Sequence, residues 1–217
     1  MTPYDIALEV EGPVAMFTRP DTGSTPVSYP VPTYSAAKGM FDAVARRPHI
    51  YVRPTRVEIC KPIRYERYVT NYGGPLRKQD QIKNDNNYQL FATVLVDVCY
   101  RIYAEVQVKQ FSTRGTARDQ VRRRRGRDWR PEFKRLFEER LARGQTFFTP
   151  CLGWKEFVPR YFGPLRSGTE PDRSVHLVIP ALLHSMWEHR RLKPVFRQDW
   201  QIGNGVMSYE QQIPLEV

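Results

Sequence analysis

The feature that most constrains the fold is a long central segment, NYQLFATVLVDVCYRIYAEVQV, whose side chains alternate with a period of two. Phe91 and Thr93 fall on one side, whereas Ala92 and Val94 fall on the other. This period is typical of a β-strand, because successive side chains of a strand point to opposite faces. The segment therefore predicts one long strand, or one long bent strand.

The chain also opens on a strand pattern, YDIALEVEG. Ile6, Leu8 and Val10 occupy inward positions, and Glu9 and Glu11 occupy outward ones. Alternation of this kind predicts a half-buried strand whose carboxylates lie on its outer side.

Two segments have helical spacing instead. In residues 33–47 the apolar positions are Ala37, Met40, Phe41 and Val44, with Thr33 or Ser35 available as N-cap and Pro48 closing the helix. In residues 130–144 they are Phe133, Leu136, Phe137 and Leu141, and Gly144 supplies a C-terminal stop.

The remaining core elements are a strand over 50–69, bent at Pro54 and Pro62, and a last strand over 155–163. The order strand, helix, strand, strand, helix, strand predicts an α+β protein with a ferredoxin-like (RRM-like) domain over residues 1–165. Long loops interrupt it at about 69–87 and at 114–130. Residues 166–217 are expected to form a small C-terminal β-rich appendage, with strand candidates at 175–180 and a hairpin at 200–213.

The basic loop carries the strongest functional signal. Residues 114–130, RGTARDQVRRRRGRDWR, hold eight arginines against Asp119 and Asp128, within a chain of net charge +11. Guanidinium groups stay charged, bind phosphate oxygens in pairs and stack on bases, so the run indicates a nucleic-acid ligand. A solvated basic loop is the alternative interpretation.

Other classes of protein are not indicated. Cys60, Cys99 and Cys151 are too scattered for a disulfide framework and are read as reduced, packed thiols, and the histidines form no metal-binding motif. We therefore expect neither a metal nor a cofactor. Without a membrane-spanning stretch or a signal sequence, the chain is predicted to be cytoplasmic and to bind no membrane.

Three segments carry a family resemblance: SYPVPTYSAAKGMFDAV, ICKPIRYE and RLARGQTFFTPCLGWKEFVPRYF. They resemble the CRISPR-associated family five proteins of the Dvulg branch, subtype I-C. The resemblance covers roughly residues 4–165, and its most specific part is residues 144–157.

The resemblance implies a ferredoxin-like domain with a small C-terminal β domain that holds the 5′ handle of crRNA in the Cascade complex of antiviral defence. It also implies metal-free cleavage of pre-crRNA, which the branch performs with a tyrosine and a Lys-His pair. Those three positions fall here on Ala45, Glu132 and Phe133, which lack the residue types that the branch uses.

Two hypotheses follow. The first is a Cascade subunit that binds the crRNA handle without cutting, in contact with the backbone and large subunits and, within the complex, with target DNA. The second is a metal-independent pre-crRNA endoribonuclease with a relocated catalytic set around His49, Tyr34 and Lys38 or an arginine, since neutral histidine is the natural base near pH 7. A general nucleic-acid-binding domain is a third reading.

The loop at 69–87 is expected to act as a thumb across the RNA. Tyr29, Tyr34, Phe147 and Phe148 are candidates to stack bases, although we expect Phe147 or Phe148 to be a core residue. The residues expected to bind RNA share a positive charge or a place at the start of the first helix, and they are Arg19, Thr33, Ser35, Lys38, Arg46, Arg47, Arg77, Lys78, Lys83, Arg114, Arg118, Arg122, Arg123, Arg124, Arg125, Arg127 and Arg130.

Overall fold

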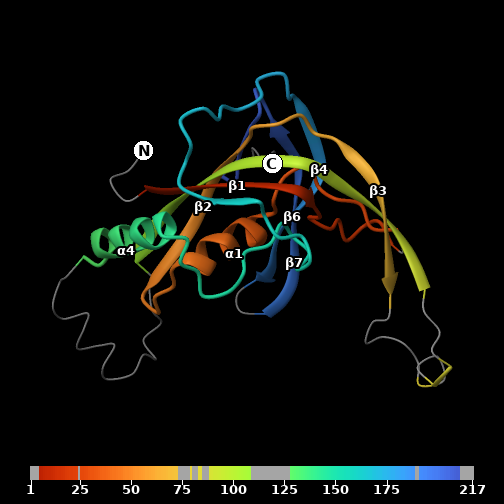
Figure 1. Cartoon of the computed structure of the whole chain (residues 1–217), viewed down its shortest axis with the longest axis horizontal. Coiled ribbons are helices and arrows are strands. Elements are labelled where there is room, and N and C mark those ends of the chain that lie inside the picture. The colour runs from red at the N-terminus through yellow and green to blue at the C-terminus, as the bar shows by residue number, and fades with distance from the viewer. Residues whose placement is uncertain are drawn as a thin grey trace, which may run out of the picture.

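The computed structural model of the chain describes residues 5–23, 25–72, 79, 83–84, 88–108, 128–188 and 191–210. It is a mixed α and β structure with mostly antiparallel strands (Figure 1). In chain order the elements are β1 (Asp5–Ala15), α1 (Tyr34–Val44), β2 (Ile50–Ile59), β3 (Tyr65–Tyr72), β4 (Tyr88–Val108), α4 (Arg130–Ala142), β5 (Tyr161–Gly163), β6 (Leu177–Glu188), β7 (Arg191–Ile202) and β8 (Val206–Ser208).

The main sheet has the strand order β5-β1-β4-β2-β8, and β3 also pairs with β4. The neighbours in this sheet run antiparallel. β4 is the long strand that the central alternation predicts. Its second half is central, because β1 pairs along one edge and β2 along the other, whereas its first half pairs with β3.

The direction of β4 changes at Asp97. This residue has a φ of 50°, which is the left-handed region that L-residues rarely adopt. It lies between the stretch paired with β3, which ends at Leu95, and the stretch paired with β2, which begins at Tyr100. Lys61 and Arg64 each donate to its carboxylate, at 2.7 and 2.9 Å. The bend is therefore located at one residue that two cations hold.

The two helices form one layer on the sheet. α1 contacts β2, α4 contacts β1 and β4, and the helices meet through the Phe41 and Phe137 rings, whose centroids are 5.6 Å apart (Figure 1). Both phenylalanines are fully buried. The predicted face of the first helix is confirmed, since Ala37, Met40 and Val44 are buried too. On the second helix Phe133, Phe137 and Leu141 are buried as predicted, whereas Leu136 is only partly buried.

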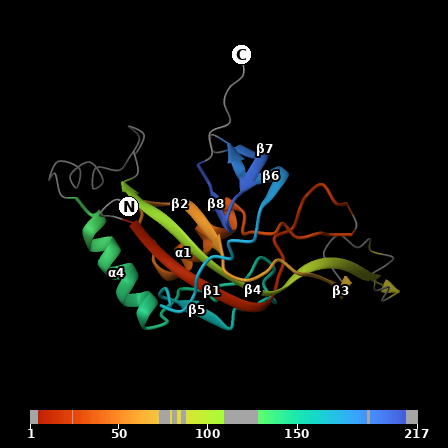
Figure 2. The same cartoon turned by 90° about the horizontal axis from the view of Figure 1, so that it is seen from above.

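The helix ends follow local chemistry. Thr33 is the N-cap of α1, because its hydroxyl accepts the Ala36 N–H at 3.2 Å, which decides between the two predicted caps. α4 ends at Ala142, and Gly144, two residues later, has the φ of 65° that is typical of glycine after a helix. Apart from the main sheet, β6 and β7 form a second sheet of two strands beside it (Figure 2).

Three sequence interpretations are wrong in detail. The segment 50–69 is two strands, because the chain leaves β2 after Ile59 and β3 pairs elsewhere on β4. The last core strand is only Tyr161–Gly163, since residues 154–157 form a turn in which the Phe157 N–H bonds the Trp154 carbonyl at 3.1 Å. The end of the expected 200–213 hairpin, β8, pairs with β2 of the main sheet.

Neither helix in the described part of the chain is long and apolar enough to cross a membrane.

Candidate nucleic-acid interface

Residues 144–157, the most specific part of the sequence resemblance, are anchored to the end of β1. Leu152 is fully buried, and its carbonyl accepts the Met16 N–H at 2.8 Å. Gly153 has a φ of 92°, and a Cβ there would lie 1.8 Å from the Met16 carbonyl oxygen. Only glycine fits this close approach of two backbones. Leu152 and Gly153 thus anchor the segment that also contains residues 144–151.

Those residues present two phenylalanines to solvent. Phe147 is 63% and Phe148 54% exposed, so the expectation that one of them is a core residue is wrong. The Phe147 N–H donates to the Ala43 carbonyl of α1 at 2.8 Å. The Arg140 guanidinium lies 4.2 Å from the Phe147 ring centroid and donates from Nε to the Val44 carbonyl at 2.6 Å. An exposed pair of flat rings therefore lies beside the end of α1, next to a cation.

Two further cations follow α1 directly. Arg46 and Arg47 are exposed, whereas Ala45 before them is 1% exposed. Arg47 lines a surface pocket of about 250 Å³ together with Pro48, His49, Trp129, Glu132, Phe133 and Leu136. The His49 and Trp129 ring centroids are 5.2 Å apart. Two of the positions matched to the branch's cleavage residues, Glu132 and Phe133, thus line the same pocket as His49.

The other candidate catalytic residues lie toward the opposite end of α1. The Tyr34 hydroxyl is 2.8 Å from the Tyr51 hydroxyl, and its ring stacks on His184 at 4.6 Å. Lys38 bonds Asp42 at 2.6 Å and lies 5.2 Å from the Tyr51 ring centroid. Burial raises the pKa of Tyr34, and burial also lowers the pKa of His184, aided by the charge of Arg197. The structure thus brings Tyr34 and Lys38 together but not with His49.

Of the other residues predicted to bind RNA, some lie in the described part of the chain and some lie outside it. Arg19 and Arg130 are described, and each forms a bidentate ion pair with a neighbouring aspartate, Asp21 or Asp128. Ser35 and Lys83 are exposed. The predictions at Arg77, Lys78, Arg114, Arg118, Arg122, Arg123, Arg124, Arg125 and Arg127 lie outside the described residues.

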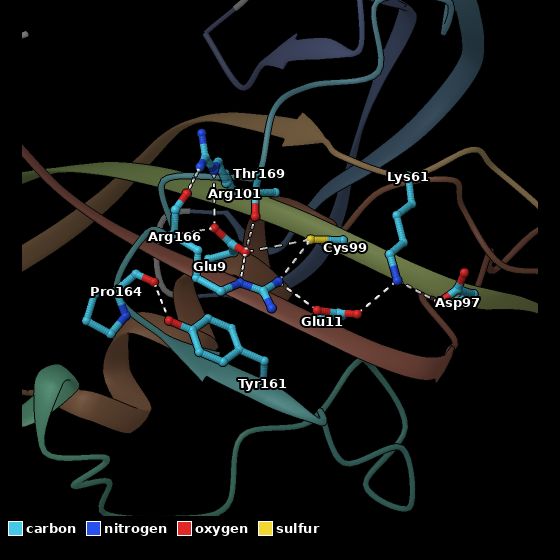
Figure 3. Close-up of polar contacts among 10 residues, drawn as sticks. All are labelled: Glu9, Glu11, Lys61, Asp97, Cys99, Arg101, Tyr161, Pro164, Arg166 and Thr169. Atoms are coloured by element: carbon cyan, nitrogen blue, oxygen red, sulfur yellow. Dashed lines mark hydrogen bonds and ion pairs between the residues drawn. The ribbon is translucent and has the colours of Figure 1, made fainter.

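Sequence reasoning missed a buried ion-pair network around Glu9 (Figure 3). The Glu9 side chain is 0% exposed, although it lies on the outward positions of β1. Its carboxylate accepts the Arg166 N–H at 3.0 Å, Arg166 Nε at 2.6 Å, the Thr169 hydroxyl at 2.8 Å and Arg101 Nε at 3.2 Å. Arg166 continues to Glu11, which Lys61 also bonds.

The network pairs its carboxylates with cations. Burial raises the pKa of Glu9, but the hydrogen bonds from Arg166, Thr169 and Arg101 outweigh it and leave that pKa below its ordinary value. Hydrogen bonds from Lys61 and Arg166 lower the pKa of Glu11 in the same way. The network therefore connects residues 166–169 to β1 and β4.

The chain is thus an α and β protein of mostly antiparallel strands that displays arginine beside exposed aromatic rings. A surface of this kind is suited to a polyanion that carries flat rings. Residues 5–191 match the family of CRISPR-associated protein (Cas_Cas5), and the chain belongs to that family.

Two relatives in sequence support the family assignment. The chain is 31% identical over 184 residues to the CRISPR pre-crRNA endoribonuclease Cas5d of Thermus thermophilus, covering 83% of this chain and 72% of that protein. It is 28% identical over 224 residues to the protein of the same name from Mannheimia succiniciproducens, covering 93% of both.

Solved structures agree at the level of the fold. The crystal structure of a CRISPR-associated protein superposes with a TM-score of 0.69 at 21% identity, covering 98% of this chain and 95% of that one. A chain of a CRISPR RNA-guided surveillance complex gives 0.51 at 14% identity, covering 94% and 91%.

Proposed function

We propose that this protein binds the repeat-derived 5′ handle of crRNA as a subunit of a Cascade-type complex and does not cut the RNA itself. The observation that carries the proposal is the state of the branch's cleavage positions within an otherwise matching family member. Ala45 is buried with no side-chain proton to move, and Phe133 is 3% exposed. Metal-free cleavage needs groups that take the 2′-OH proton, stabilise the phosphorane and protonate the leaving 5′-oxygen.

The binding half of the proposal has separate support. Arg46 and Arg47 are exposed just after α1, and the exposed Phe147 is bonded to the Ala43 carbonyl near the same end of that helix. Cations for phosphates and flat rings for unstacked bases are therefore both displayed near the end of α1. The relatives are named for an activity on pre-crRNA, and the surveillance-complex chain shares the fold.

We also infer the finer architecture from the fold. The order β5-β1-β4-β2, with α1 and α4 on one face, supports a ferredoxin-like domain over residues 1–165. Residues 166–217 would form the β-rich appendage, and the segments at 69–87 and 114–130 would contact RNA or neighbouring subunits. Backbone and large subunits are the proposed protein partners, with target DNA bound in the complex and the cytoplasm as the compartment.

The test is incubation of the purified protein with labelled repeat RNA from its own CRISPR locus, in EDTA, with binding and cleavage followed together. Tight binding that prefers the repeat over scrambled RNA, without cutting, is the expected result. Equal affinity for unrelated RNAs would instead favour a general nucleic-acid-binding domain.

A second candidate function is metal-independent cleavage, and the pocket that holds His49 favours it. His49 would take the 2′-OH proton while O2′ attacks phosphorus, and Arg47 would stabilise the phosphorane. The P–O5′ bond would then break as the imidazolium formed at His49 gives its proton to the leaving 5′-oxygen through water. The products are a 2′,3′-cyclic phosphate and a 5′-hydroxyl. Chelator-insensitive cutting that His49→Ala abolishes, with binding retained, would establish this function in place of the first.

A further inference from the structure

A small apolar slot opens between α1 and the residues that follow the exposed phenylalanines. Its volume is about 150 Å³. One wall is α1, where Ala36, Gly39 and Met40 lie, and the other is formed by Phe148, Pro150, Cys151 and Gly153. An apolar cavity of about this volume is enough to hold a benzene ring, but it is well below the size of drug-like ligand sites. The slot therefore fits one small flat ring.

Packing does not require a glycine at position 39 of α1, which lines the slot. A Cβ on Gly39 would meet nothing within 4 Å among the described residues outside its own helix, and the residue is in the middle of α1. Glycine inside a helix costs about 1 kcal/mol relative to alanine. Neither close packing nor a left-handed φ explains glycine at this position, where a larger side chain would enter the slot.

The charges around the slot suit a phosphate-bearing ring. Arg140 lies over Phe147, next to the slot's Phe148, and Arg46 and Arg47 follow the end of α1. Burial raises the pKa of the Cys151 thiol, which the charge of Lys155 lowers and the charge of Glu156 raises. Lys38 precedes Gly39 and pairs with Asp42. The Arg140 guanidinium, 4.2 Å from the ring centroid of Phe147, thus places a positive charge at the residue that precedes the slot's Phe148.

The segment that forms the outer wall is held in place. In Figure 1 the chain after α4 passes beside α1, and the Phe147 N–H bond to the Ala43 carbonyl fixes the start of this passage. Gly153 fixes its end against Met16. Phe148 is thus an exposed ring on a rigid support, which is the form that base-stacking side chains take in single-stranded RNA recognition.

We propose that this slot receives one flipped-out nucleobase of the crRNA 5′ handle, with Phe148 as the stacking wall and Gly39 as the floor. The inference rests on the proposed handle binding and names the subsite that would recognise a single base. Base–aromatic stacking of this kind changes affinity roughly tenfold when the aromatic side chain is removed.

The test pairs protein variants with an abasic scan. Handle RNA from the chain's own locus, with one abasic site at a time, is titrated against the full-length protein and against Gly39→Leu, which fills the slot. One abasic position should weaken wild-type binding roughly tenfold and should have no further effect in Gly39→Leu. Phe148→Ala should behave like Gly39→Leu, and Phe196→Ala is the matched control because Phe196 is a similarly exposed ring on β7.

Two more readouts separate a ligand role from a structural one. Gly39→Ala should raise the melting temperature, because it improves the helix, and yet weaken handle binding. Handle RNA should also slow alkylation of Cys151 but not of Cys60, which is partly exposed elsewhere on the protein.

The outcomes are distinguishable. If the wild type does not bind its repeat RNA, the proposed function itself fails. If it binds and every abasic position affects the wild type and Gly39→Leu equally, the slot does not hold a base and the inference is overturned. Unchanged RNA affinity in Gly39→Leu with lost assembly of the complex would assign the slot to a protein partner, which also overturns it.

Discussion

Glu9→Gln is the substitution that tests the structural reading most severely. The buried carboxylate receives four hydrogen bonds from Arg166, Thr169 and Arg101. An amide keeps the shape, but its NH₂ group faces donors and its neutral charge leaves Arg101 without compensation. The Arg101 side chain is only 13% exposed, so water cannot replace the lost partner there.

The magnitude follows from the burial of the partners. Removal of one partner from a buried ion pair costs about 3–5 kcal/mol. Because the Arg166 side chain is 40% exposed and solvent screens that half of the network, we expect the lower end, about 3 kcal/mol. For a chain of this size that corresponds to a fall in melting temperature of roughly 6–12 °C.

The assay is urea unfolding followed by circular dichroism at pH 7. Asp97→Asn is the matched control, since Asp97 is 44% exposed in its pairs with Lys61 and Arg64, and it should cost less than about 1 kcal/mol. A Glu9→Gln protein within about 1 kcal/mol of the wild type would refute the view that this network fastens residues 166–169 to the sheet.

The pH dependence gives an independent check. The folded-state pKa of Glu9 is lowered from 4.5, so its ionised form stabilises the fold above that value. This contribution is lost as the pH falls through the folded-state pKa. The stability difference between wild type and Glu9→Gln should therefore be largest near neutral pH and shrink in acid. A difference that stays constant down to the acid limit of folding would contradict the assignment.

Three further expectations can be measured with the same protein. Gly153→Ala should lower the free energy of unfolding in urea by more than about 3 kcal/mol, because its Cβ would meet the Met16 carbonyl oxygen at 1.8 Å. Gly23→Ala, which has open space around it, should lower it by only about 1 kcal/mol. Equal losses would contradict the close approach of the two backbones. Tyr51→Phe should lose about 0.5–1.5 kcal/mol with the hydrogen bond to Tyr34, and no loss would mean that the bond contributes nothing. If the arginine run binds phosphates, neutralising Arg122 to Arg125 should reduce the slope of log affinity against log salt by roughly 3 in anisotropy titrations, and an unchanged slope would leave the run a solvated loop.

The sequence predicted the local features best. The buried face of α1, its closure before Pro48 and the long β4 follow from periodicity and helix-end chemistry, which act within a few residues. The prediction of a strand over residues 155–160 was wrong, because the turn at Trp154 follows the contact of Gly153 with Met16, which is far away in the sequence. A period-2 pattern does not contain such contacts.

The Glu9 network and the candidate site were harder to predict for the same reason. Glu9 is on the outward side of β1 as expected, but it is buried because Arg166 and Thr169, more than 150 positions later, cover it. Likewise His184 of β6 stacks on Tyr34 of α1, 150 positions earlier in the sequence. The exposure of Phe147 and Phe148 likewise could not be read from composition, because large apolar residues are usually buried.

The bend at Asp97 has a consequence for how proteins of this kind can diversify. On one side of it β4 is enclosed by β1 and β2, and on the other it forms an extension with β3 that reaches out at the end opposite α4 (Figure 2). β1 pairs with β4 as far as Leu95, whereas β3 pairs with residues 88–95 and β2 with residues 100–108. Residues could therefore be added or removed at the outer ends of β3 and β4 without altering the register of β4 with β1 and β2. The outer hairpin is thus a replaceable module: its length can adapt to different RNAs or neighbours while the central sheet stays the same.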